Sequence, residues 1–227
     1  MANLITVGRL LLLFIVIFFL YVAPISLAGV SMLSLIVVFA GDGIDGWVAR
    51  RRGSTSQFGA VFDIAGDRVV EQVLWIVYAH LGVIPLWVPL LVVTRGTIVD
   101  ALRSLSYADG MTAFGSRNMM RSPLSRWLTA GRFMRGFYGV AKAIAFVFLA
   151  GLVGYEADGS GWLGAFYDLA VVRWLGWSFV WIAVALTVIR GLPVIIDALT
   201  YASSQASGTP AARAPRVDPS SDEGTGT

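Results

Sequence analysis

Four aspartates near the middle of the first half of the chain are spaced so that helices would gather their carboxylates. Asp42 and Asp45 are three residues apart. Asp63 and Asp67 are four residues apart. Residues at these separations share one face of a helix. If the two helices pack side by side, four carboxylates meet and repel one another unless cations neutralise them. The pattern predicts a pair of divalent cations, which could also clamp the oxygens of a phosphate group.

The remaining residue types restrict which metal chemistry is open to the chain. It contains no cysteine and a single histidine, His80. This excludes disulfides, thiolate metal sites and histidine-rich zinc or iron sites. Any metal must therefore be held mainly by carboxylates. Carboxylate oxygens suit hard cations, so the sequence predicts Mg²⁺ or Mn²⁺.

The composition places these aspartates in a membrane protein. Of the 227 residues, 57% are hydrophobic and 14% are charged, and the mean hydropathy is +0.75. Soluble domains carry roughly 25% charged residues. A charged group inside a membrane span costs about 2.5–3.5 kcal/mol on insertion scales. Aspartates that remain inside membrane spans despite this cost indicate a functional site. The length of the chain fits a single helix bundle.

Six stretches are apolar over about the 20 residues that a spanning helix needs. They run over residues 4–22, 25–41, 58–81, 85–105, 132–153 and 171–199. The first lacks a basic N-terminal region and a convincing cleavage site, so we expect a retained helix rather than a signal peptide. The sequence thus predicts an all-α, polytopic membrane helix bundle over residues 1–202. Residues 203–227 are rich in Ser, Gly, Pro and Ala and are predicted to form a disordered tail.

The charges of the loops predict the orientation of the bundle. Arginines gather between the second and third stretches, between the fourth and fifth, and in the tail. The other loops are uncharged or mainly acidic. The positive-inside rule then places both termini in the cytoplasm. We expect a multi-pass protein of a bacterial-type inner membrane, with its active site on the cytoplasmic side.

The segment around the aspartates carries a more specific signal. It reads Asp42-x2-Asp45-Gly46-x2-Ala49-Arg50-x8-Gly59-x3-Asp63-x3-Asp67. At every fixed position this resembles the signature of the CDP-alcohol phosphotransferases. Near the start of the chain, Asn3, Thr6 and Arg9 are similar to the Asn-x2-Thr-x2-Arg of that family. The resemblance extends to the six-span layout and does not cover the tail.

The resemblance implies an activity and a role for each matched residue. The four aspartates would hold two divalent cations, and Asp67 would also be the general base. The CDP-linked lipid donor would be contacted by Thr6, Gly46, Arg50, Ser56 and Gly59. An acceptor alcohol deprotonated by Asp67 would attack the β-phosphate of the donor, and CMP would leave. Charge neutralisation and alignment are what such transfers chiefly need. The resemblance also implies a homodimer, by analogy only.

Basic residues further along the chain predict the acceptor. The segment Thr94–Arg103 resembles the Ser/Thr-Arg-Glu-x6-Arg segment of phosphatidylglycerophosphate synthases, with Gly96 in place of the usual Glu. A basic cluster facing the bundle suits a phosphorylated acceptor, because arginine binds phosphate through two nitrogens. Glycerol 3-phosphate ranks first and inositol phosphate second. The residues expected at the acceptor phosphate are Arg95, Arg103, Arg132, Arg135 and Lys142.

Other interpretations remain open at this level. A transporter could use intramembrane carboxylates for cations or protons, although a cation path has no need of Arg50. The downstream basic residues could instead extend to the membrane interface. Glu71, one turn beyond Asp67, has no assigned role. The expected partners are the donor, the acceptor and membrane lipids, with no nucleic acid.

Overall fold

The computed structural model describes residues 2–52, 57–108 and 131–206. Within these ranges, side chains are described for residues 4–41, 59, 61–102, 131 and 133–196. The predicted tail therefore falls mostly outside the described residues, although helix is seen as far as residue 206.

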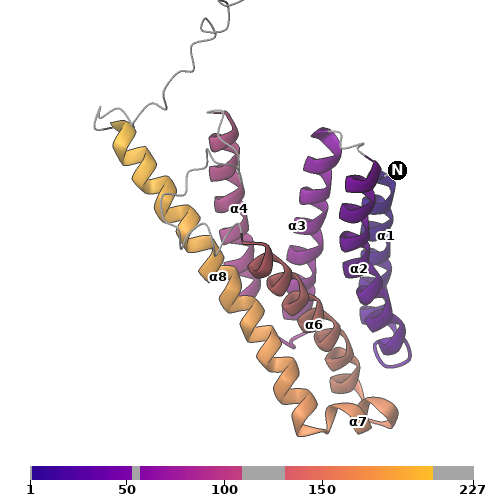
Figure 1. Cartoon of the computed structure of the whole chain (residues 1–227). Coiled ribbons are helices and arrows are strands. Elements are labelled where there is room, and N and C mark those ends of the chain that lie inside the picture. The colour runs from indigo at the N-terminus through magenta and orange to yellow at the C-terminus, as the bar shows by residue number, and fades with distance from the viewer. Residues whose placement is uncertain (1, 53–56, 109–130, 207–227) are drawn as a thin grey trace, which may run out of the picture.

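The described part of the chain is helical, without strands, as predicted. Its helices are α1 (Ala2–Val22), α2 (Ala28–Arg52), α3 (Gln57–His80), α4 (Trp87–Ala108), α6 (Arg132–Ala157), α7 (Gly161–Tyr167) and α8 (Ala170–Ala206). The six long helices follow the six predicted apolar stretches in order. In Figure 1, α1 and α2 lie side by side at one edge, α8 runs along the opposite edge, and α6 lies between them.

Three of the described helices are long and apolar enough to cross a membrane, over Leu4–Val22, Phe133–Ala157 and Ala170–Ile196. They make the chain a membrane protein by composition. The apolar part of α2, Ala28–Gly41, is shorter, and α3 and α4 carry charged side chains along their length. Six spans with cytoplasmic termini therefore stay a prediction.

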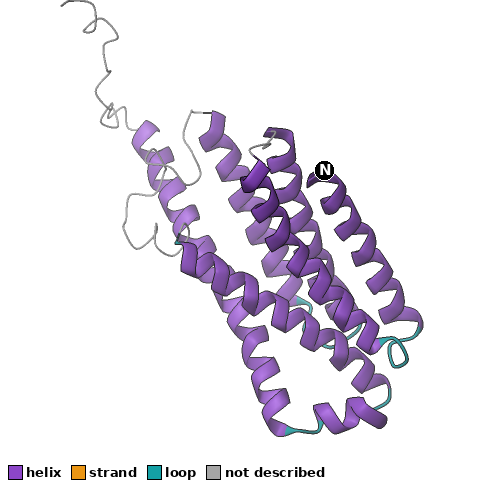
Figure 2. Ribbon diagram, turned by 45° about the vertical axis from the view of Figure 1, so that its right-hand side comes forward, coloured by secondary structure: helices purple, strands orange, loops and turns teal. Residues whose placement is uncertain are grey.

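Two elements differ from the expected boundaries. Helix α2 does not end at Gly41 but continues to Arg52, so Asp42 and Asp45 lie within the helix. The arginines at its end favour this extension, because cations stabilise the C-terminal end of a helix dipole. The segment expected to be an acidic loop contains the short helix α7, at the end of the bundle away from the N-terminus (Figure 2).

The short helix α7 is held by its own apolar side. Leu163, Gly164 and Tyr167 are buried, and the Tyr167 hydroxyl donates a hydrogen bond of 2.8 Å to the Phe148 carbonyl of α6. Burial raises the pKa of Tyr167, so this hydroxyl stays protonated and able to donate. This segment was predicted to be a loop because of its charges. It forms a helix because its apolar residues pack against α6.

The core that positions α3 is centred on Phe146 of α6. The ring of Trp75 meets it edge-on, with ring centroids 4.7 Å apart, and Phe39 of α2 stacks on it at 5.6 Å. Tyr78 of α3 donates a hydrogen bond of 2.7 Å to the Phe146 carbonyl. These contacts, made by fully buried Trp75, Tyr78 and Phe146, fix α3 against α6 below the aspartates.

Candidate active site between α1, α2 and α3

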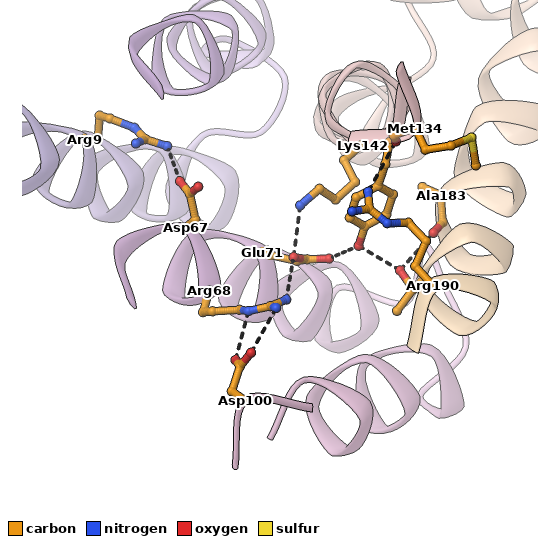
Figure 3. Close-up of polar contacts among 11 residues, drawn as sticks. Arg9, Asp67, Arg68, Glu71, Asp100, Met134, Lys142, Ala183 and Arg190 are labelled. Carbon is orange, nitrogen blue, oxygen red and sulfur yellow. Dashed lines mark hydrogen bonds and ion pairs between the residues drawn. The ribbon is translucent and has the colours of Figure 1, made fainter. Parts of the chain in front are cut away.

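Asp63 and Asp67 lie on α3 and meet one buried arginine of α1. Arg9 Nη2 donates a hydrogen bond of 2.8 Å to Asp67 Oδ1, and Arg9 Nη1 is 3.6 Å from Asp63 Oδ1. Arg9 Nε also donates to the Val38 carbonyl of α2 at 3.0 Å. Figure 3 shows the Arg9–Asp67 contact. A single guanidinium therefore joins three helices and places positive charge beside both carboxylates.

The carboxylates are only partly shielded from solvent. The exposed fraction is 39% for the Asp63 side chain and 43% for the Asp67 side chain. Asp63 Oδ1 itself is buried and receives no hydrogen bond from the described residues. A buried carboxylate oxygen without a donor is costly. Such an oxygen beside a second carboxylate suits a hard cation, which prefers oxygen ligands.

The close packing of α1 against α3 and α2 depends on small residues. A Cβ added to Gly66 would lie 2.6 Å from Thr6 Cγ2, and one added to Gly41 would lie 3.2 Å from Arg9 Cδ. Thr6 is 3% exposed. Small residues allow membrane helices to approach this closely. Thr6, predicted as a donor contact, thus lies directly against the residue before Asp67.

Several predicted site residues cannot be placed at this site. Among the described residues, no group of three or more His, Asp or Glu side chains could hold a metal. The other two predicted ligands, Asp42 and Asp45, lie on α2 with their side chains outside the described set, as do Gly46 and Arg50. Ser56 lies outside the described residues altogether, and Gly59 is half-buried on α3.

A cavity of about 700 Å³ opens beside Asp67. Its polar lining comes from Arg9, Asp67, Glu71 and Lys142. The rest is mostly apolar and comes from α2, α3, α6, α7 and α8, including Ile36, Val147, Phe166, Leu175 and Phe179. A cavity with one charged region and a long apolar lining suits an amphipathic ligand with a charged or polar head.

The predicted acceptor residues separate into different environments. Lys142 is 16% exposed and pairs with Glu71, Nζ to Oε2 at 3.0 Å. Arg95 is half-buried on α4, and a Cβ added to Gly191 of α8 would lie 2.6 Å from its Nε. Arg135 is exposed. The side chains of Arg103 and Arg132 lie outside the described set.

Three further residues near Lys142 were missed by the sequence interpretation. Tyr138 and Thr187 are buried, and Arg190 is 9% exposed with its guanidinium 5.0 Å from the Tyr138 ring centroid. Arg190 interrupts the apolar run of α8, and a charge inside such a run is a usable signal of function. Tyr138 and Thr187 give no comparable signal, because either residue is ordinary in a helix interior.

Comparisons with known proteins point the same way as the geometry. Residues 1–189 match the family model described as CDP-alcohol phosphatidyltransferase. Curated relatives named putative cardiolipin synthase, from Mycobacterium bovis and from two strains of Mycobacterium tuberculosis, are 34% identical over 80 residues. The aligned part covers 34% of this chain and 38% of each relative, so the chain spans well under half the length of these relatives.

Proposed function

This chain belongs to the CDP-alcohol phosphatidyltransferase family, and on that premise we propose that it transfers a phosphatidyl group from a CDP-linked lipid to an alcohol, with release of CMP. It is a transferase of substituted phosphate groups. The observation that carries the proposal is Asp67 in the charged region of an otherwise apolar cavity, where it shares Arg9 with Asp63. A lipid donor needs both an apolar surface and neutralisation of its pyrophosphate.

The proposal includes a site for Mg²⁺ or Mn²⁺ formed by Asp42, Asp45, Asp63 and Asp67. The pair fits a hard cation, since it offers adjacent carboxylates and a buried Asp63 oxygen that receives no hydrogen bond from the described residues. When bound, such cations neutralise the phosphate oxygens and stabilise the leaving group. The aspartates position the charge, and Arg9 supports them with its hydrogen bond to Asp67.

Asp67 has the general-base role in this proposal. The acceptor hydroxyl gives its proton to the Asp67 carboxylate as its oxygen bonds to the β-phosphorus. The bond between that phosphorus and the oxygen of CMP breaks, and CMP leaves with the electron pair. The Arg9 hydrogen bond orients the carboxylate, while the half-exposed setting of Asp67 leaves room for the acceptor to approach. Orientation of this kind is what phosphoryl transfer draws on most.

Glycerol 3-phosphate is the proposed acceptor. Support comes from the basic side chains that follow the aspartates, with Lys142 in the cavity lining and Arg68, Arg95 and Arg190 on the helices around it. Inositol phosphate is the second phosphorylated candidate. The name of the mycobacterial relatives, putative cardiolipin synthase, and the apolar lining of the cavity favour a third candidate, an alcohol carried by a phospholipid.

One assay tests the reaction and its acceptor together. Purified protein receives CDP-diacylglycerol, Mg²⁺ or Mn²⁺, and one acceptor at a time: glycerol 3-phosphate, inositol phosphate or phosphatidylglycerol in vesicles. We expect CMP release that requires an acceptor and stops when the cation is chelated, because the carboxylates need cations to hold the pyrophosphate. Absence of acceptor-dependent CMP with every compound would refute the proposed function.

Replacing Arg9 with methionine is expected to make thermal stability depend more strongly on divalent cations. Methionine keeps a long stem against Gly41 but removes the positive charge beside Asp63 and Asp67. Without cation we expect a loss of about 1–2 kcal/mol, because a hydrogen bond to a charged group contributes about 1.5–3 kcal/mol and the partial exposure of these carboxylates reduces that value. Unfolding midpoints are compared in detergent with Mg²⁺ and with chelator.

The matched control for this variant is Arg173→Met, which removes an exposed arginine at the start of α8. Its midpoint should respond to Mg²⁺ as the wild type does. If Arg9→Met and Arg173→Met show the same response, Arg9 does not share its carboxylates with a cation.

A further inference from the structure

Glu71 is a buried acid that the proposed reaction does not use. It lies one turn beyond Asp67 on α3 and is 3% exposed. Its Oε1 accepts a hydrogen bond from the Tyr138 hydroxyl, and its Oε2 accepts one from Lys142 Nζ at 3.0 Å. Arg68 Nη1 lies 3.7 Å from the same Oε2. Figure 3 shows Glu71 between Lys142 and Arg68.

The contacts of Glu71 belong to a network that joins four helices. The Tyr138 hydroxyl of α6 is 2.9 Å from the Thr187 hydroxyl of α8. Arg68 Nε of α3 pairs with Asp100 of α4 at 3.0 Å. Lys142 Nζ also lies 4.4 Å from the Tyr138 ring centroid. Arg68 therefore has a carboxylate of its own, and the shortest ionic contact of Glu71 is with Lys142.

Stability alone does not explain why Glu71 and Lys142 form a buried ion pair. Removing two charges from water costs about as much as their attraction returns, and well-packed apolar residues would hold the helices at least as firmly. A buried Glu71–Lys142 pair therefore indicates that Lys142 has a function other than stability. Lys142 lines the cavity together with Asp67 and Glu71, so that function is to bind a ligand there.

Counting donors shows what Lys142 can offer. Its ammonium group carries three N–H bonds. Within the described residues one of them is given to Glu71 as a hydrogen bond. The other two are left for a ligand in the cavity. Because a lysine stem is flexible, the bond to Glu71 fixes the ammonium in place before the ligand arrives, which lowers the ordering cost of binding.

We propose that Glu71 is a positioning residue, which holds Lys142 so that its remaining N–H groups bind the phosphate of the acceptor. The inference rests on the proposed function. Glu71 does not touch the acceptor and acts through Lys142. The shared chemistry is an acceptor phosphate, on a small molecule such as glycerol 3-phosphate or in the headgroup of a phospholipid.

The main test is the steady-state kinetics of Glu71→Gln with CDP-diacylglycerol and glycerol 3-phosphate. Glutamine keeps the size of the side chain and an acceptor for Tyr138 but removes the charge that holds Lys142. We expect the acceptor KM to rise about tenfold or more, since a hydrogen bond to a charged group is worth that factor. The KM for the donor should not change. The matched control is Glu156→Gln, an exposed acid near the other end of α6, which should leave both KM values as in the wild type.

A second set of variants separates positioning from general damage. If Glu71 acts through Lys142, the double variant Glu71→Gln, Lys142→Gln has the acceptor KM of Lys142→Gln alone, because coupled residues are not additive. Tyr138→Phe keeps the ion pair and removes one hydrogen bond to Glu71, so it should raise the acceptor KM by less than Glu71→Gln does. Tyr138→Phe also serves if Glu71→Gln does not fold.

The outcomes are distinct. Multiplying effects in the double variant, or a donor KM that rises together with the acceptor KM, would overturn the positioning role. If the wild type uses phosphatidylglycerol rather than glycerol 3-phosphate, the same kinetics are measured with vesicles of that lipid. A wild type without acceptor-dependent CMP release refutes the proposed function itself, which is a separate result.

Discussion

Replacing Asp67 with asparagine is expected to abolish turnover and leave the protein folded and able to bind its CDP-linked donor. Asparagine has the same shape, and its carbonyl oxygen can accept the 2.8 Å hydrogen bond from Arg9. It cannot take a proton from the acceptor hydroxyl. General-base catalysis contributes about 10²–10⁴-fold, and the lost negative charge weakens cation binding as well. CMP release measures turnover, and protection of the unfolding midpoint by CDP-diacylglycerol measures donor binding.

The matched control is Asp168→Asn. Asp168 is an exposed aspartate between α7 and α8 that accepts a hydrogen bond from the Tyr155 hydroxyl. Its replacement should leave CMP release at the wild-type rate. Wild-type turnover in Asp67→Asn would remove Asp67 from the role of base, and a variant that neither turns over nor binds donor would show that Asp67 is needed to assemble the site.

Replacing Gly154 with valine is expected to separate α6 from the start of α2. A Cβ at Gly154 would lie 2.7 Å from the carbonyl oxygen of Pro24 and 3.0 Å from Ala28 Cβ. The first of these atoms belongs to the backbone, and the turn that carries it is held by the hydrogen bond from Leu27 N to the Ala23 carbonyl. The overpacking cannot be relieved by a side-chain rotation, so we expect a loss of about 3 kcal/mol.

For a chain of this size that loss corresponds to a fall of roughly 6–12 °C in the unfolding midpoint. Tryptophan fluorescence in detergent can follow the transition. Gly136→Val is the control on the same helix, because a Cβ there meets no atom within 4 Å. Equal midpoints for the two valine variants would mean that α6 and α2 do not approach as closely as the structure has them.

The parts of the fold and site that were predictable from sequence are those encoded by short spacings. The four-residue separation of Asp63 and Asp67 is visible in the sequence, and the structure places both beside one arginine. The apolar runs likewise predict the long helices, since their length is a local property. The sequence did not predict that α2 continues beyond Gly41 to Arg52. Hydropathy shows where an apolar span ends, and a helix can continue past that point.

The rest depends on contacts between residues far apart in the chain. Arg9 and Asp67 are 58 positions apart, and Tyr138 and Glu71 are 67 apart. No periodicity within one helix predicts which face of another helix it will meet. Glu71 could be recognised as unusual, but its partner Lys142 could be assigned only after α3 and α6 had been placed together. The roles of Asp42 and Asp45 stay predictions, because their side chains lie outside the described set.

If α3 spans the bilayer as the sequence predicts, the contact of Arg9 with α2 and α3 also bears on how the chain enters the membrane. A helix that carries two aspartates enters lipid at a high electrostatic cost when it enters alone. Arg9 is on the first helix of the chain, so the compensating guanidinium precedes these carboxylates during synthesis. Once the hairpin of α1 and α2 has formed, α3 can pack against it with Asp63 and Asp67 beside the positive charge of Arg9. Biogenesis of the bundle would then not depend on inorganic ions, and the cations proposed for the site would bind only after the helices have assembled.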